Sequence, residues 1–168
     1  MNHKINLEGY VDSDWVGSAI DRKSTSGCCF SMGSGVISWF RRKQSCVELS
    51  IAEAEYVAAF SASCEVVWMR KLLYDLFDLQ LDATCIHCDN QSFMKLSENP
   101  VFHDKSKHVE IKYHYIKDMV QRTAVKLWYV AMDEQIANVL PKQLARVKFE
   151  YFRENIGVLH IEAPPKGR

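Results

Sequence analysis

Three acidic positions that lie far apart in the sequence have the residue types and the setting of a single metal site. Asp12 follows the apolar-rich run 7–11 and Asp89 follows the run 85–88, so both are expected at the ends of strands. Glu55 lies in a segment with helical periodicity, which also carries Glu53, and the periodicity does not choose between these two glutamates. Carboxylates that converge on one edge of a sheet form an oxygen cage for divalent cations. This chemistry fits phosphodiester hydrolysis.

The bulk composition predicts one globular domain. The chain has 168 residues, which is enough to bury a real core, and we expect one domain over residues 1–160 and a disordered tail over 161–168. Its 21 lysines and arginines balance its 21 aspartates and glutamates, so the formal net charge is zero. A strong autonomous nucleic-acid binder is usually basic, so any positive surface should be local or supplied by a neighbouring domain.

The cysteine pattern and the hydropathy bear on location. The 6 cysteines have no disulfide-framework spacing and no signal peptide precedes them, which predicts reduced thiols in an intracellular compartment, cytoplasmic or nuclear. No apolar stretch approaches the roughly 18 residues of a membrane span, so no membrane partner is expected. The first six residues are polar and lead at once into a strand, as expected of a piece of a longer polypeptide.

The elements that must position the acids are strand hairpins followed by alternating helices and strands. Gly33 and Gly35 favour a tight turn between the second and third strands. Ser50 is a plausible cap for a helix that continues toward Phe77, with a break in it left open. The expected strands cover 7–12, 26–32, 36–40, 83–88 and 124–131, and the expected helices cover 49–77, 90–97, 109–121, 133–140 and 144–155.

This order favours a mixed sheet with helices on its faces. The antiparallel hairpins should lie on one side, and the later strands should add in parallel through right-handed crossovers. On the long helix, the periodicity predicts one apolar face made of Leu49, Ala52, Tyr56, Ala59, Phe60, Ser63 and Val67.

Four motifs, in order, carry a specific resemblance. They are the segments YVDSDW at 10–15, STSG at 24–27, AEYVA at 54–58 and CDNQS at 88–92. With them the chain, over roughly residues 8–158, resembles the ribonuclease H domain of Ty1/copia-type retrotransposon Pol polyproteins. The resemblance implies a ribonuclease H-like α/β fold, a five-stranded mixed sheet flanked by helices. It also implies endonucleolytic cleavage of the RNA strand of RNA–DNA hybrids, two Mg²⁺ ions (with Mn²⁺ as a substitute) and a reverse transcriptase domain upstream.

The resemblance assigns the acids individually. Asp12 matches the first family acid and Asp89 matches the third. For the helical acid it selects Glu55, because the family acid is followed by two apolar residues and an alanine, as in Tyr56-Val57-Ala58. Asp14 is expected to belong already to the turn after the first strand.

The fourth acid departs from the family pattern. Where the family has Ala-Asp-Val-Leu-Thr-Lys, this chain has ANVLPK at 137–142, so that Asn138 stands at the aspartate position. An amide oxygen can still face a metal ion but brings no charge, so a second ion should bind more weakly. Asp133 and Glu134 are expected to complement a helix dipole rather than to replace the ligand. The residues expected to bind metal and to act in catalysis are therefore Asp12, Glu55, Asp89 and Asn138.

Recognition of a hybrid would depend on its helical geometry and its 2′-hydroxyl groups rather than on base sequence. The expected nucleic-acid contacts are Arg41, Arg42, Lys43, Gln91, Ser92, Lys105 and Lys107. The rival interpretation is a degenerate or co-opted copy that folds and binds nucleic acid but has little or no nuclease activity. A further alternative is a purely structural domain that supports a polymerase neighbour.

Overall fold

A computed structural model describes residues 6–18, 20–91, 94 and 107–158, with side chains described from residue 110 onward in the last range. The expected helix 90–97 and the expected tail fall largely outside this part of the chain. A bilayer crossing needs a length and apolarity that none of the described helices combines.

The centre of the fold is a five-stranded mixed sheet, as the sequence predicts. Its strands are β1 (Leu7–Asp14), β2 (Thr25–Met32), β3 (Gly35–Lys43), β4 (Thr84–Cys88) and β5 (Val125–Tyr129). Their order across the sheet is β3-β2-β1-β4-β5. The first three strands pair antiparallel, whereas β4 and β5 add in parallel beside β1. The antiparallel-then-parallel prediction is therefore confirmed.

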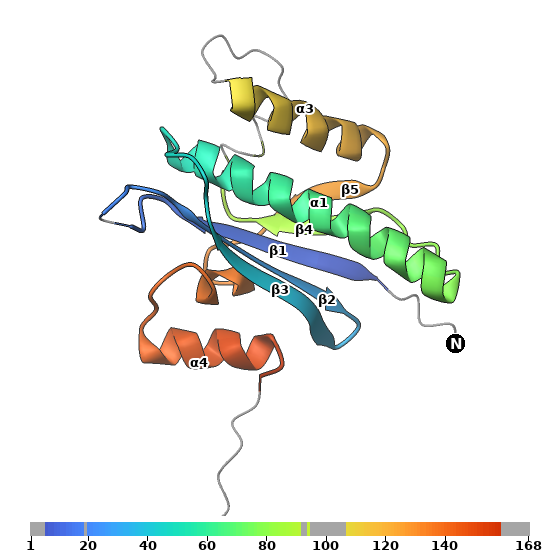
Figure 1. Ribbon diagram of the computed structural model, residues 1–168. Coiled ribbons are helices and arrows are strands. Elements are labelled where there is room, and N and C mark those ends of the chain that lie inside the picture. Colours follow the sequence, from blue (N-terminus) through green and yellow to red (C-terminus); the bar gives the residue numbers. More distant parts are fainter. Residues whose placement is uncertain (1–5, 19, 92–93, 95–106, 159–168) are drawn as a thin grey trace, which may run out of the picture.

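Two helices cover one face of the sheet (Figure 1). They are α1 (Ile51–Phe77), which crosses β1, β2 and β4, and α3 (Lys107–Gln121), which packs on α1. The N-terminal half of α1 presents small side chains to the sheet, and Ala54, Ala58 and Ala62 are fully buried. Small residues let the helix approach the strands closely, which brings the residues between them into the interior.

The start of α1 has a reciprocal cap. The Glu53 N–H donates to Ser50 Oγ at 3.2 Å, and Glu53 Oε2 accepts from the Leu49 N–H at 2.8 Å. The first bond satisfies a donor that a helix N-terminus leaves unpaired, and the second ties the Glu53 carboxylate to the residue before the cap. The cap predicted at Ser50 is confirmed, and the helix runs without a break to Asp78, whose left-handed backbone (φ 52°) ends it.

The opposite face carries a short 3₁₀ helix, η1 (Ile136–Val139), and α4 (Arg146–Asn155) (Figure 1). The turn after η1 lies directly on β2, because a Cβ added to Gly27 would stand 2.5 Å from Pro141 Cδ and 2.8 Å from Leu140 Cβ. Only glycine permits this approach. The glycine of the STSG motif thus lets the C-terminal segment reach the sheet.

The predicted helix over 133–140 is wrong, because only the four residues of η1 are helical. The buried Gln135 side chain explains the difference. Its Nε2 donates to the carbonyls of Val11 and His87, both at 3.0 Å, and its Oε1 accepts from the Ala137 N–H. These bonds tie the chain to β1 and β4 where a longer helix would start.

Two other expectations on the sheet need correction. The third strand continues past Phe40 to Lys43, because Arg41, Arg42 and Lys43 stay in register with β2. Charged residues are common on such an edge strand, where they discourage pairing with other chains. Asp14 is the last residue of β1 rather than part of the turn.

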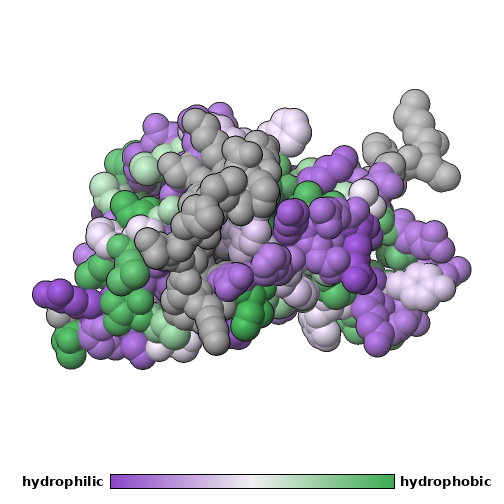
Figure 2. Space-filling model, turned by 90° about the horizontal axis from the view of Figure 1, so that it is seen from above, coloured by the Kyte–Doolittle hydropathy of each residue, from purple (hydrophilic) through white to green (hydrophobic). Residues whose placement is uncertain are grey.

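The apolar face predicted for α1 is only partly right. Tyr56, Ala59 and Ser63 are buried, but Leu49 is 79% exposed and Val67 is 37% exposed. Leu49 precedes the helix, and Val67 lies in the C-terminal half, which extends beyond the tightly packed alanines. Seen from the side that α3 covers, hydrophobic side chains lie among hydrophilic ones (Figure 2).

Candidate metal centre

The fold brings three carboxylates from distant parts of the chain to one point. Asp12 lies on β1, Glu55 on the first turns of α1, and Asp89 directly after β4. One carboxylate oxygen from each lies within 4.8 Å of the others. Because β1 and β4 are parallel neighbours, both strands deliver an acid to the same edge of the sheet, and α1 supplies the third from above.

Glu55 and Asp89 form what we term the carboxylate side of the centre. Glu55 is 3% exposed and its Oε1 accepts a hydrogen bond from Ser13 Oγ at 3.0 Å. Its Oε2 is buried and accepts no hydrogen bond from any described residue, and the same holds for Asp12 Oδ2. Buried carboxylate oxygens are normally hydrogen-bonded, so two unsatisfied ones on clustered acids call for an explanation such as an ion.

Asn138 and Lys142 form the opposite, lysine side. Lys142 Nζ donates to Asp12 Oδ1 at 2.7 Å and to Asn138 Oδ1 at 2.9 Å. The Asn138 amide in turn donates from Nδ2 to the Met132 carbonyl at 2.9 Å, which fixes its orientation. Asp12 is therefore shared between the two sides: Oδ1 is bound by the lysine, Oδ2 accepts no hydrogen bond from the described residues, and the residue clusters with the other two acids.

Burial dominates the electrostatics of the centre. It raises the pKa of Glu55 to about 8 and the pKa of Asp12 to about 7, with repulsion from the neighbouring acids adding to both shifts. Lys142 opposes the shift at Asp12 without cancelling it. Burial also raises the pKa of Asp89. Without a cation, ionised carboxylates are thus disfavoured here.

The pKa of Lys142 is raised, whereas burial alone would lower the pKa of a lysine. Burial lowers this pKa, but attraction to Asp12, together with Asp89 and Glu55, raises it more. The ammonium therefore stays charged beside the acids.

A cleft of about 540 Å³ opens over the centre. Glu55, Asp89 and Lys142 lie in its wall, whereas the fully buried Asp12 is not among its lining residues. The rest of the lining combines aromatic and apolar side chains with polar ones. The lining residues are Ser13, Asp14, Trp15, Ile51, Glu55, Asp89, Asn90, Gln91, Tyr129, Met132 and Lys142.

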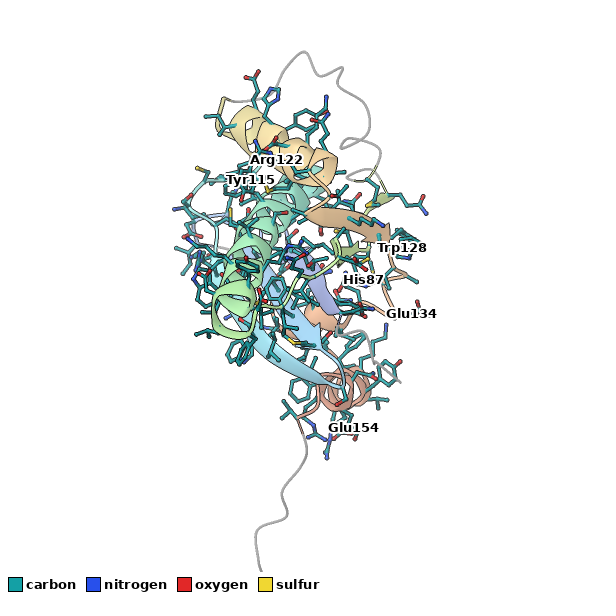
Figure 3. All side chains as sticks on the ribbon, turned by 90° about the vertical axis from the view of Figure 1, so that its right-hand side faces the viewer. His87, Tyr115, Arg122, Trp128, Glu134 and Glu154 are labelled. Carbon is teal, nitrogen blue, oxygen red and sulfur yellow. The ribbon has the colours of Figure 1, made fainter. Side chains whose placement is uncertain are left out.

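The surroundings of Glu53 differ from those of Glu55. Glu53 serves in the cap of α1, with its carboxylate on the Leu49 N–H, and it is not among the three clustered acids. The structure thus brings Glu55, which the family pattern selects, to the cluster. Asp133 pairs at 2.6 Å with Lys148 on the exposed surface, and Glu134 projects on the side of the sheet away from α1 (Figure 3).

The expected nucleic-acid contacts are placed unevenly. Gln91 lines the cleft, and Arg41 lies in one row across the sheet with Gly27 and Asp12. The guanidinium of Arg42 lies 5.4 Å from the centre of the Phe40 ring, and Lys43 is paired with Asp21 at 2.6 Å. Ser92 and Lys105, and the side chain of Lys107, lie outside the described residues.

Sequence reasoning missed three polar residues around the centre: Lys142, Ser13 and Gln135. Ser13 follows the first acid directly, and Lys142 ends the ANVLPK segment four residues after Asn138. The spacing of Lys142 from Asn138 was the available signal, since both lie close together across one turn. Gln135 gave no signal, because its role depends on two strands that are distant in sequence.

Comparison with known proteins gives relatives over nearly the whole chain. The chain is 38% identical over 152 residues, 90% of its length, to the retrovirus-related Pol polyprotein from transposon TNT 1-94 of Nicotiana tabacum. It is 38% identical over 161 residues, 96% of its length, to the corresponding polyprotein from transposon RE2 of Arabidopsis thaliana. The chain spans 11% of the length of each of these relatives. No protein-family model matches it.

Solved structures agree on the fold. A crystal structure of LC11-RNase H1 in complex with an RNA/DNA hybrid matches 80% of this chain and 93% of its own, with a TM-score of 0.58 and 13% identity. The protease-reverse transcriptase of prototype foamy virus matches 95% of this chain over 22% of its own, with a TM-score of 0.50 and 11% identity. At these identities the likeness establishes the architecture alone.

Proposed function

The chain is related over nearly its whole length to the retrovirus-related Pol polyproteins of transposons and has a ribonuclease H-like fold, and from this premise we propose that it cleaves the RNA strand of RNA–DNA hybrids with the help of divalent cations. In this proposal it is the ribonuclease H part of a copia-type polyprotein. It acts during reverse transcription, beside a reverse transcriptase domain.

The observation that supports the proposal most directly is the cluster of Asp12, Glu55 and Asp89. One oxygen of each lies within 4.8 Å of the others, and Glu55 and Asp89 line an open cleft with Asp12 buried behind them. Two of the buried oxygens, Asp12 Oδ2 and Glu55 Oε2, accept no hydrogen bond from the described part of the chain. A hard cation such as Mg²⁺ prefers carboxylate oxygens, so the donor set fits this kind of ion.

Asp12, Glu55 and Asp89 would hold the metal, and the Asn138 amide oxygen could join as a weaker fourth ligand only by giving up its bond to Lys142 Nζ. Bound there, divalent cations would lower the pKa of an attacking water and offset the charge on the leaving 3′ oxygen. The protein residues supply orientation: Ser13 fixes the Glu55 carboxylate and Lys142 fixes Asp12. None of the three acids needs to act as a nucleophile.

The substrate would lie in the cleft over the acids. Trp15 and Tyr129 are about half exposed on its rim and offer apolar surface to sugars and bases. Gln91 and Arg41 are the described candidates for sugar and phosphate contacts. The solved relative in fold, LC11-RNase H1, is in complex with an RNA/DNA hybrid, which supports the same substrate class here.

A labelled RNA–DNA hybrid incubated with Mg²⁺ or Mn²⁺ tests the proposal. We expect endonucleolytic cleavage of the RNA strand, no cleavage of the DNA strand, and loss of activity in Asp12→Asn. The same hybrid in excess chelator is the control for metal dependence. Cleavage that persists in chelator, or that Asp12→Asn leaves intact, would contradict the proposed centre.

One observation favours a second candidate function, a copy that binds hybrids but cuts them poorly. Asn138 stands where the family pattern has an acid, and a lysine rather than a metal ligand contacts it. A gel-shift titration with the uncleaved hybrid separates the two. Binding without cleavage in either metal would favour this second candidate, whereas absence of binding would contradict both.

A further inference from the structure

We propose that the ammonium of Lys142 is a built-in cation of the centre, which fills its lysine side and limits the metal-binding residues to a single divalent ion. The inference rests on the proposed function, because it concerns how the same acids take up metal. It assigns to Lys142 a positioning role that the family pattern does not state.

The contacts of Lys142 are those of a bound cation. Its Nζ lies 2.7 Å from Asp12 Oδ1 and 2.9 Å from Asn138 Oδ1, so it uses one oxygen of each of the two residues expected to share a second ion. Its side chain is 28% exposed and the Asp12 side chain is fully buried. Charge-assisted bonds of this length in a partly buried site are strong ones.

The oxygens that bear on the number of ions fall into two groups, those that accept no hydrogen bond from a described residue and the one that Lys142 binds. Asp12 Oδ2 and Glu55 Oε2 accept no hydrogen bond among the described residues, and both belong to acids that cluster with Asp89. Asp12 Oδ1 is already taken by the lysine. One divalent ion can therefore bind to free oxygens without displacing a protein group, whereas a second ion on the lysine side must displace an ammonium first.

The charge balance points the same way. With Asn138 in place of an acid, the lysine side has the single negative charge of Asp12 to offer, and one ammonium matches it. A divalent ion beside Lys142 would meet a positive charge at close range and only a neutral amide as its additional ligand. Coulomb repulsion between cations a few ångströms apart is substantial in a partly buried site.

The backbone holds Lys142 in position. Its N–H donates to the Asn138 carbonyl at 3.3 Å, and the preceding Pro141 is buried against Gly27 of β2. The close approach at Gly27 leaves this turn little freedom to withdraw. A rigid turn is what a resident charge requires, because a mobile lysine would yield to a divalent ion.

Counting bound ions tests the inference without using activity. Calorimetric titration with MnCl₂, supported by spin-resonance measurement of free Mn²⁺, should give one ion per chain for the wild type. Lys142→Met keeps the length of the side chain and removes the charge. We expect it to bind a second Mn²⁺, or to bind the first about tenfold more tightly, since a neighbouring positive charge is gone.

Two control variants separate charge from structure. Lys142→Arg keeps the charge and should bind one ion like the wild type. Lys148→Met removes another paired lysine, on α4 and bonded to Asp133 at 2.6 Å, and should also leave the count at one. A merely structural role of Lys142 would lower the melting temperature of Lys142→Met without changing the number or affinity of ions.

Each outcome decides something. Two ions on the wild type, or identical binding by wild type and Lys142→Met, would overturn the inference while leaving the proposed function intact. Binding by Lys142→Met alone would overturn the expected single ion of the wild type and contradict metal use by the wild type. Absence of binding by every variant would overturn both. If Lys142→Met does not fold, Lys142→Gln replaces it, and the wild-type count remains decisive.

Discussion

The two sides of the candidate metal centre solve the same electrostatic problem in opposite ways. On the lysine side, Lys142 satisfies Asp12 and Asn138 with bonds of 2.7 and 2.9 Å. On the carboxylate side, Asp12 Oδ2 and Glu55 Oε2 are buried without a hydrogen-bond donor from the described residues. The protein thus neutralises one half of the centre with its own cation, whereas in the proposed function a metal ion would neutralise the other half.

The difference separates residues that stabilise the fold from residues whose burial lowers its stability. A satisfied ion pair holds the C-terminal segment on the sheet, whereas unsatisfied buried carboxylates cost stability unless something binds them. Such costs are usually retained where they serve a function. Changes on the carboxylate side should therefore affect activity most, and changes on the lysine side should affect both activity and folding.

The largest effect is expected when a negative charge is removed from the carboxylate side. We expect Glu55→Gln to lower the rate of hybrid cleavage by about 10³-fold, because loss of a charged metal ligand removes several kcal/mol of transition-state stabilisation. Glu53→Gln, two residues away in the helix cap, should change the rate less than about threefold. Single-turnover cleavage of a labelled hybrid measures both. Equal losses in the two variants would refute the assignment of Glu55.

The support of the lysine side can be tested at Gly27. Gly27→Ala places a methyl group against Pro141 and Leu140, so we expect a loss of about 1–3 kcal/mol in the free energy of unfolding. Gly35→Ala is the matched control, because an added Cβ there meets no atom within 4 Å. Urea denaturation of both variants gives the comparison. A Gly27→Ala protein as stable as Gly35→Ala would show that the turn is not held as described.

Restoring an acid on the lysine side should make the two sides more alike. We expect Asn138→Asp to raise the cleavage rate in Mg²⁺ by about tenfold, since carboxylate count governs the binding of hard cations. The measurement is the dependence of the rate on Mg²⁺ concentration, which should shift to lower metal. The rate would stay unchanged if the amide already suffices as a ligand.

The smallest expected effect is a pH dependence of stability in the metal-free protein. The pKa values of Glu55, about 8, and Asp12, about 7, exceed their unfolded values of 4.5 and 3.8, so the folded chain binds more protons between these limits. Stability is therefore greatest at low pH in this window and falls as pH rises through 7 and 8. Because the cleft admits water, we expect a loss of about 1 kcal/mol, or 2–4 °C in melting temperature.

The same melts contain their own controls. Added Mg²⁺ should flatten the slope, since a bound cation favours the ionised carboxylates, and Glu55→Gln should reduce it. A melting temperature that rises between pH 5 and 8 would contradict the burial of these acids.

Much of the fold could be predicted because it depends on local pattern. The hairpin at Gly33 and Gly35, the Ser50 cap and the alternation of strands after the long helix are properties of short segments. The boundaries of the strands were harder to predict, because neighbouring strands set them. For example, β3 extends to Lys43 because β2 continues beside it. No short segment of the sequence shows where such a pairing ends.

Some residues of the candidate metal centre could be predicted from the sequence and others could not. Asp12 and Asp89 could be placed because strand ends on neighbouring parallel strands meet at one edge. The choice between Glu53 and Glu55 needed the family pattern. Lys142 and Gln135 could not be assigned roles, since each acts on groups more than a hundred residues away along the chain.

The bond between Lys142 and Asp12 joins residues 130 positions apart. During synthesis at about 5–20 residues per second, Asp12 waits many seconds for its partner. The hairpins and α1 can pack during that interval, but the segment carrying Gln135, η1 and Lys142 is synthesised only after them. A ribosome-bound chain ending before residue 135 would hold its three acids without the contacts of Gln135 and Lys142, so the lysine side of the centre forms only after the carboxylate side has been synthesised.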